Sequence, residues 1–222
     1  MIGKIIALDW RATIRLHKLA FLMYPFFAFI VGTTLSQMLM LPFCAWMALV
    51  YSTNSFYAEE KGELNNLYQT LPVKRSQIVF ARYVYSLKIL VAVIAMGLII
   101  MPVARHFSSS RWYLGIRGNV ALVAVSVLIY AILNIMTFPP FFKLNYHKGK
   151  IVSLYVVTAV FFVSVISYYL FMLLSENNIT FDFIVFASEN MLLVSGGIMA
   201  SAAMIILLSY RLSIRFYTQR EL

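Results

Sequence analysis

The residues in this sequence best suited to catalysis are two adjacent carboxylates, Glu59 and Glu60. Paired glutamates serve some intramembrane peptidases, which also need an arginine shortly after the pair and histidines on neighbouring helices to activate water. Leu64 stands where that arginine is needed. The three histidines all lie in loops or flanks of apolar segments: His17, His106 and His147. The sequence therefore argues against this chemistry, and the same scatter of histidines argues against a metal site.

A nucleotide-binding site of its own is not expected in this chain. The phosphate-binding loop G-x-x-x-x-G-K-[ST] cradles phosphates with backbone amides and neutralises them with its lysine. Both Gly-Lys pairs, Gly3-Lys4 and Gly149-Lys150, are followed by Ile and lack the earlier glycine. The single cysteine, Cys44, lies in an apolar segment, where packing is the expected role. We therefore expect no enzyme and no cofactor bound by this chain.

The composition predicts an all-α integral membrane protein with a single transmembrane domain over residues 1–222. Hydrophobic residues make up 62% of the chain and charged residues only 12%, whereas soluble domains carry roughly 25% charged residues. Apolar stretches near the length of a membrane span occur at 19–35, 38–56, 84–104, 119–142, 151–174 and 191–210. The first two are almost continuous, and we separate them at residues 33–37 because one helix would far exceed the bilayer thickness.

The basic residues predict the orientation of these spans. All but three of the 18 Lys and Arg residues fall on one side if both termini are cytoplasmic, and the loop at 175–190 is acidic with no basic residue. The positive-inside rule then places both ends in the cytoplasm, and we expect a multi-pass protein of a bacterial plasma membrane. This arrangement also explains the net charge of +10 without a nucleic-acid partner.

Residues 1–18 are predicted to form a helix lying in the inner membrane interface. On a helical wheel one face is basic and the broadly opposite face is mainly apolar, with Asp9 as an exception. The basic face contains Lys4, Arg11, Arg15 and Lys18, and the other contains Ile2, Ile6, Trp10 and Thr13. A merely basic flank of the first span is the alternative interpretation.

The predicted spans offer little for an ion-driven transport mechanism. They contain no Asp, Glu or His, and their one basic residue, Lys88, lies near the inner end of the third span. Transporters that move protons or cations usually need ionisable groups at depth. Neutral polar groups occur instead, among them Tyr130, Asn134, Thr137 and Ser164. They predict either hydrogen bonds between helices or a substrate cavity, and the driving energy is expected to come from outside the membrane.

The loop at residues 57–75 is the most informative polar segment. Leu64, Leu67, Tyr68 and Leu71 share one stripe of a short helix. Acidic residues begin this helix, in keeping with the helix dipole, and Pro72 ends it. Such an amphipathic helix packs either on the membrane face of its own protein or in a groove of a partner.

The loop and its flanks resemble the signature of ABC-type export permeases of the second class. The resemblance rests on Glu59-Glu60-Lys61, on Leu67-Tyr68-x-Thr70-Leu71-Pro72-Val73-Lys74-Arg75 and on Ile78-Val79-x-Ala81-Arg82-Tyr83. It implies an in-plane N-terminal helix, six spans and a coupling helix that docks on a separate ATPase. A second basic loop at residues 139–150 resembles the family's turn between spans four and five. The implied docking residues are Glu59, Glu60, Lys61, Leu64, Leu67, Tyr68, Leu71, Pro72, Lys143, Tyr146 and Lys148.

The resemblance also implies a function and an assembly. The expected protein is an exporter of amphipathic or hydrophobic substrates, namely peptides, lipids or drugs, including the peptide or phenol-soluble-modulin exporter type. Two permease chains, as a homodimer or heterodimer, would pair with ABC ATPase subunits that bind ATP and Mg²⁺. In the family the last outer loop often contains short helices that dip into the bilayer, and within the loop at 175–190 residues 179–187 are apolar enough to do so. The alternative from another class is a six-span assembly or immunity protein that binds a partner and transports nothing.

Overall fold

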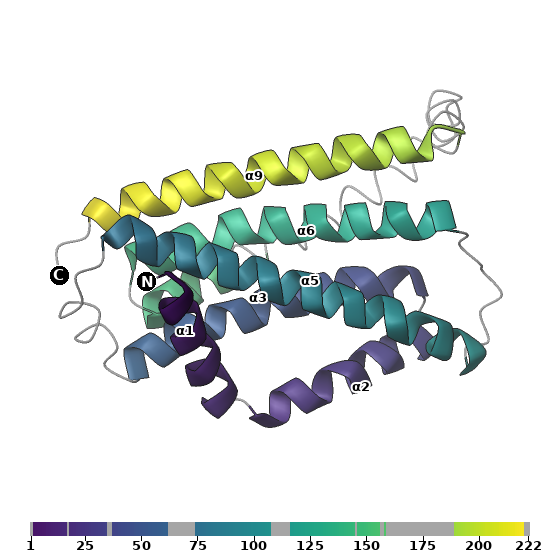
Figure 1. Ribbon diagram of the computed structural model, residues 1–222, viewed down its shortest axis with the longest axis horizontal. Coiled ribbons are helices and arrows are strands. Elements are labelled where there is room, and N and C mark those ends of the chain that lie inside the picture. The colour runs from purple at the N-terminus through teal and green to yellow at the C-terminus, as the bar shows by residue number, and fades with distance from the viewer. Residues whose placement is uncertain are drawn as a thin grey trace.

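The computed structural model describes residues 2–16, 18–34, 37–61, 74–107, 116–144, 146–155, 158 and 189–219 of the chain. Within these ranges every regular element is a helix, as the composition predicts. The helices are α1 (Ile2–Leu16), α2 (Lys18–Thr34), α3 (Gln37–Lys61), α5 (Arg75–Phe107), α6 (Ile116–Lys143) and α9 (Met191–Gln219). Figure 1 shows α3, α5, α6 and α9 running lengthwise, with α1 crossing them near the end that carries both termini.

Three of the predicted spans are confirmed as long apolar helices. α5, α6 and α9 are each long and apolar enough to cross a membrane, which makes this a membrane protein. α2 supplies a shorter apolar helix at Met23–Thr33, and α2 and α3 are separate helices, as predicted. The fifth predicted span lies outside the described residues except for 151–155 and 158. The count of six spans therefore stays a prediction.

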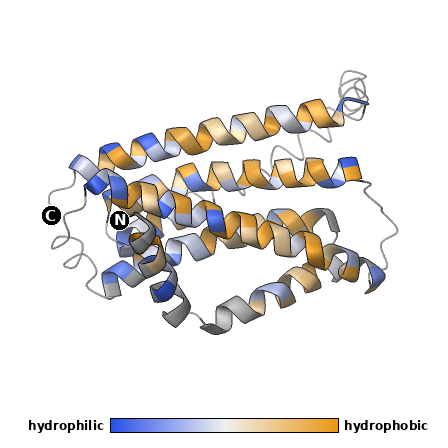
Figure 2. Cartoon of the chain, in the orientation of Figure 1, coloured by the Kyte–Doolittle hydropathy of each residue, from blue (hydrophilic) through white to orange (hydrophobic). Residues whose placement is uncertain are grey.

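The two ends of the helical bundle differ in charge. Figure 2 shows hydrophobic residues over the middle of the long helices and hydrophilic residues gathered toward their ends. At one end α3, α6 and α9 finish and α5 begins, and we call this the basic end. Its exposed basic residues include Lys74, Lys143, Arg211 and Arg215. The other end, where α6 and α9 begin, is called the opposite end.

Small residues allow α3 and α5 to approach closely. A Cβ atom at Gly97 would lie 3.0 Å from Cδ2 of Leu41 and 3.1 Å from Sγ of Cys44. Cys44 is itself buried in this contact, which agrees with the predicted packing role. Small residues at helix interfaces bring backbones together in lipid, where hydrophobicity alone does not drive helix association. The pair α3 and α5 is thus anchored well inside the bundle.

Helix α1 packs against the bundle through a face that the helical wheel did not single out. Ile5, Asp9 and Thr13 are buried, while Arg11 is exposed on the other side. Trp10, predicted to share the apolar face, is 40% exposed and meets the edge of the Tyr85 ring at 6.3 Å. The prediction divided the helix into two faces, whereas an interfacial helix docked on a bundle has three surroundings: protein, lipid and water. Asp9 is therefore part of the protein contact.

Helix α6 carries two consecutive prolines close to its end. Pro139 and Pro140 both lie inside the helix, which continues to Lys143. A proline has no backbone N–H, so the carbonyl four residues earlier lacks its helical donor. One turn earlier, Oγ1 of Thr137 donates to the carbonyl of Leu133 at 2.8 Å. The helix thus passes through an interruption in its ladder before it reaches the basic end.

Candidate functional site

A buried ion pair joins α3 to α5 at the basic end. Glu59 lies in the last turn of α3 and Arg82 lies two turns into α5. Nη2 of Arg82 donates to Oε2 of Glu59. Only 1% of Arg82 and 7% of Glu59 is exposed. The pair therefore joins the two helices between which the predicted coupling loop runs. Most of that loop lies outside the described residues.

Aromatic rings enclose this ion pair. The guanidinium carbon of Arg82 lies 4.4 Å from the ring centroid of Phe56 and 5.7 Å from that of Phe142. Phe56 also stacks on Phe141, with ring centroids 5.1 Å apart and planes at 19°. Ring faces attract a guanidinium and exclude water from it. Exclusion of water strengthens the attraction between the two charges, and the rings extend the contact from α3 and α5 to α6.

The first residue of α5 reaches the end of α9. Nη1 of Arg75 donates to the backbone carbonyls of Tyr217, at 3.4 Å, and of Thr218, at 3.3 Å. The last carbonyls of a helix have no partner within it, and the helix dipole favours a cation at this position. The Tyr217 ring also contacts Phe142, with centroids 5.5 Å apart. The basic end consequently ties α9 to α5 and α6.

The segment predicted as the second basic loop, which belongs to α6 up to Lys143 and is helical again at residues 146–155, packs against the end of α3. The ring of Tyr146 contacts Tyr57 at 5.2 Å and stacks on Phe141 at 5.7 Å. Nε2 of His147 lies 3.7 Å from Oε1 of Glu60. Burial, together with the neighbouring Tyr57 and Glu60, raises the pKa of Tyr146, so its hydroxyl stays protonated at pH 7. The residues flanking the predicted coupling loop and the second loop thus form one surface.

Close packing fixes the second loop in this position. A Cβ atom at Gly149 would lie 2.8 Å from Cδ1 of Phe141 and 3.2 Å from its Cα. Only glycine fits so near to another backbone. Any larger residue at this position would move the loop away from α6.

The predicted docking residues divide into three groups. Glu59 is buried, so its carboxylate faces Arg82 instead of the surface as predicted, because the arginine draws it into the aromatic cluster. Glu60, Lys143 and Lys148 are exposed and Tyr146 is half-buried. Lys61 is the last residue of α3. The remaining docking residues lie outside the described residues: Leu64, Leu67, Tyr68, Leu71 and Pro72. Docking itself stays a prediction.

Two of the predicted cavity residues join helices. Tyr130, Asn134 and Thr137 are all buried. The hydroxyls of Tyr130 and Ser86 share a hydrogen bond, and Oδ1 of Asn134 accepts one from Ser209. For Tyr130 and Asn134 this geometry matches the first of the two predicted roles, hydrogen bonding between helices, whereas Thr137 donates to carbonyls of its own helix. Ser164, the fourth of these residues, lies outside the described residues.

Two residues at this site went unrecognised in the sequence. Arg82 was counted only as an inner basic residue, although the coupling-loop signature contains both it and Glu59. The hydroxyl of Tyr83 lies 2.6 Å from Oγ of Ser209 and 2.8 Å from Oγ of Ser213, and so joins α5 to α9. Nothing in the sequence around Tyr83 specifies these partners, which lie more than a hundred residues away.

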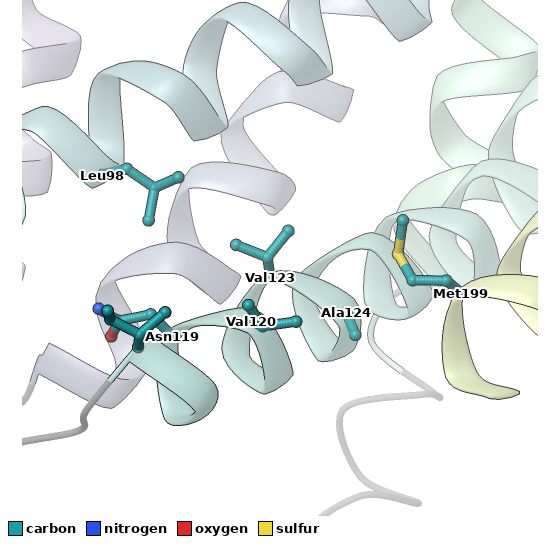
Figure 3. A pocket seen from close by; sticks show the side chains of 7 residues that line it. Leu98, Asn119, Val120, Val123, Ala124 and Met199 are labelled. Atoms are coloured by element: carbon teal, nitrogen blue, oxygen red, sulfur yellow. The ribbon is translucent and has the colours of Figure 1, made fainter. Parts of the chain in front are cut away.

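A cavity of about 270 Å³ opens at the opposite end, among α5, α6 and α9. Figure 3 shows the side chains of Leu98, Val120, Val123 and Met199 around it, with Asn119 as the polar exception. Tyr130, Asn134 and Thr137 do not line this cavity. The predicted cavity residues and the observed hollow are thus different parts of the molecule.

Comparison with known proteins relates nearly the whole chain to a transporter family. A family model described as ABC-2 family transporter protein matches residues 4–218. No curated protein and no solved structure matches the chain significantly.

Proposed function

This chain belongs to the ABC-2 family of transporter proteins, and from that premise we propose that it is the permease subunit of an ATP-driven exporter. Its substrates would be amphipathic or hydrophobic molecules: peptides, lipids or drugs. ABC ATPase subunits, each binding ATP and Mg²⁺, would supply the energy from the basic end. Two permease chains would share one transport path.

The observation that carries this proposal is the meeting of two chain segments at the basic end. Tyr57 and Glu60 in the last turns of α3 contact Tyr146 and His147 of the second loop. Both segments belong to the two loops, 57–75 and 139–150, whose sequences resemble loops of ABC export permeases. Their contact supports a single composite surface on which an ATPase could press, with exposed Lys143 and Lys148 at its side.

The proposed orientation puts the basic end in the cytoplasm. Exposed cations at that end agree with the positive-inside rule. ATP binding would draw two ATPase subunits together, and the docked loops would pass that motion to the helices. Access to the path between the permeases would then change from the inner to the outer side.

The test is copurification of an ATPase with the permease from its native membrane. Replacing Leu67 and Tyr68 together by Asp should abolish copurification and leave the permease in the membrane, because two carboxylates would face an apolar groove. The control is Ile116→Asp, which adds one carboxylate at a site that is 82% exposed at the opposite end. Unchanged copurification of the double variant would contradict this docking site.

Substrate class is tested on the copurified complex in vesicles. Amphipathic cationic peptides should stimulate ATP hydrolysis, and soluble peptides of equal charge without an apolar face should not. A permease that never copurifies with an ATPase would instead be a partner-binding membrane protein that transports nothing.

A further inference from the structure

The ion pair of Glu59 and Arg82 has a position that stability alone does not explain. A buried ion pair loses hydration when the protein folds, and a well-packed apolar pair is often at least as stabilising. Here the charges are placed where α3 ends and α5 begins. Glu59 and Arg82 are 23 residues apart, and the chain between them contains residues 60–75, most of the predicted coupling loop.

We propose that Glu59 and Arg82 are positioning residues that hold the two ends of the coupling loop as one unit, so that a force on the loop moves α3 and α5 together. This inference rests on the proposed function. It adds a residue pair that converts a movement of the loop into a movement of the bundle.

The geometry around the pair favours a rigid link. A guanidinium held between ring faces has its orientation fixed as well as its distance. Phe56 belongs to α3 and Phe142 to α6, and both contact the Arg82 guanidinium. A change in the tilt of α3 against α5 would therefore disturb the ion pair and the Phe56 contact together, and a change in the tilt of α6 against α5 would disturb the Phe142 contact.

The same cluster extends the link to the remaining long helix. Arg75, the first residue of α5, donates hydrogen bonds to backbone carbonyls in the last turn of α9. Tyr217 of α9 contacts Phe142 of α6. A load at the loop thus reaches α3, α5, α6 and α9 through side chains at the basic end of the bundle.

The experiment measures the distance between the two ends of the loop with spin labels on Glu60→Cys and Lys74→Cys, in a Cys44→Ala background. Both labelled positions are exposed, whereas Cys44 is buried. A double variant, called the latch variant below, combines Glu59→Leu with Arg82→Met. It removes both charges of the ion pair at once and leaves no unpaired buried charge to destabilise the protein. Lys88→Gln, which removes an exposed cation from the same helix, is the control.

The permease alone should give one narrow distance distribution, unchanged in the control. The latch variant should broaden it and shift it to longer distance. In the copurified complex trapped with ATP and orthovanadate, the wild-type distance should stay the same while the latch-variant distance lengthens further. A latch variant with the wild-type distribution in both states would overturn the proposal. Failure of the wild type to copurify with any ATPase would overturn the proposed function separately, because the first measurement needs no ATPase.

Discussion

Oγ of Ser209 donates a hydrogen bond to Oδ1 of Asn134 at 3.0 Å, and this contact ties α9 to α6 where both side chains are buried. Hydrogen bonds between helices in lipid contribute about 0.6 kcal/mol on average and at most about 1.7 kcal/mol. Replacing Asn134 by Leu should therefore lower the free energy of unfolding by an amount in this range, measured by denaturation in detergent. Ser201→Ala is the control, because among the described residues Ser201 bonds to the carbonyl of Ile198 in its own helix and not to another helix. Equal losses in the two variants would contradict the assignment.

Removal of one partner of the buried ion pair should cost much more than removal of both. Arg82→Met alone leaves the Glu59 carboxylate among aromatic rings, and breaking a buried pair in this way costs about 3–5 kcal/mol. Adding Glu59→Leu removes the stranded charge and should restore most of the stability. Thermal unfolding of the two variants beside the wild type measures the difference. If the double variant were less stable than Arg82→Met, the charges would not be acting as a pair.

A larger residue at Gly97 should force α3 and α5 apart. The position has no space for a side chain, since Leu41 and Cys44 approach within contact distance of an added Cβ. Gly97→Val should therefore destabilise the protein by about 1–3 kcal/mol, the usual cost of overpacking.

The control for this overpacking is Gly197→Val in α9, where the described residues place no atom within 4 Å of an added Cβ. Retained stability in the control and loss in Gly97→Val are expected from unfolding curves. A larger loss of stability in Gly197→Val than in Gly97→Val would show that the contact between α3 and α5 leaves room for a side chain at position 97.

The orientation of the bundle can be measured directly with a maleimide that does not cross membranes. In a Cys44→Ala background, Ile116→Cys at the opposite end should react in intact cells, because that end is proposed to face outward. Gln219→Cys, exposed at the basic end, should react only after the membrane is opened. Labelling of Gln219→Cys in intact cells would reverse the proposed topology.

Hydropathy alone indicates only the apolar part of each helix, and capping signals are needed for the extensions. The third span is predicted at 84–104 by hydropathy, while Ser76 as a helix cap predicts a helix that leads into it through Arg82 and Lys88, and α5 begins at Arg75. Hydropathy treats Arg82 as the end of an apolar stretch, whereas in the structure Glu59 and aromatic rings compensate its charge. For the same reason α3 extends beyond the predicted Phe56 to Lys61, and Glu59 belongs to this helix instead of starting a new one.

The coupling-loop signature indicated the region of the site but not its geometry. A pattern of residue types shows that Glu59 and Arg82 occur near a functional loop, but it does not show that they bind each other. Their pairing depends on how two helices pack, and the sequence between them does not encode that packing locally. Asn134 shows the same limit, because its chemistry left open a hydrogen bond between helices and a place in a substrate cavity, and only the packing of α6 against α9 brings it to Ser209.

The two prolines of α6 make the turn before them the part of this helix that bends most readily. Because Pro139 and Pro140 provide no donors, the carbonyls of Ile135 and Met136 lack their helical partners, and fewer backbone hydrogen bonds resist bending at this turn. The end of α6 after the prolines carries Phe141 and Phe142, while the longer part before them carries Tyr130. The two parts of the helix can therefore change their angle to each other without a tilt of the part before the prolines.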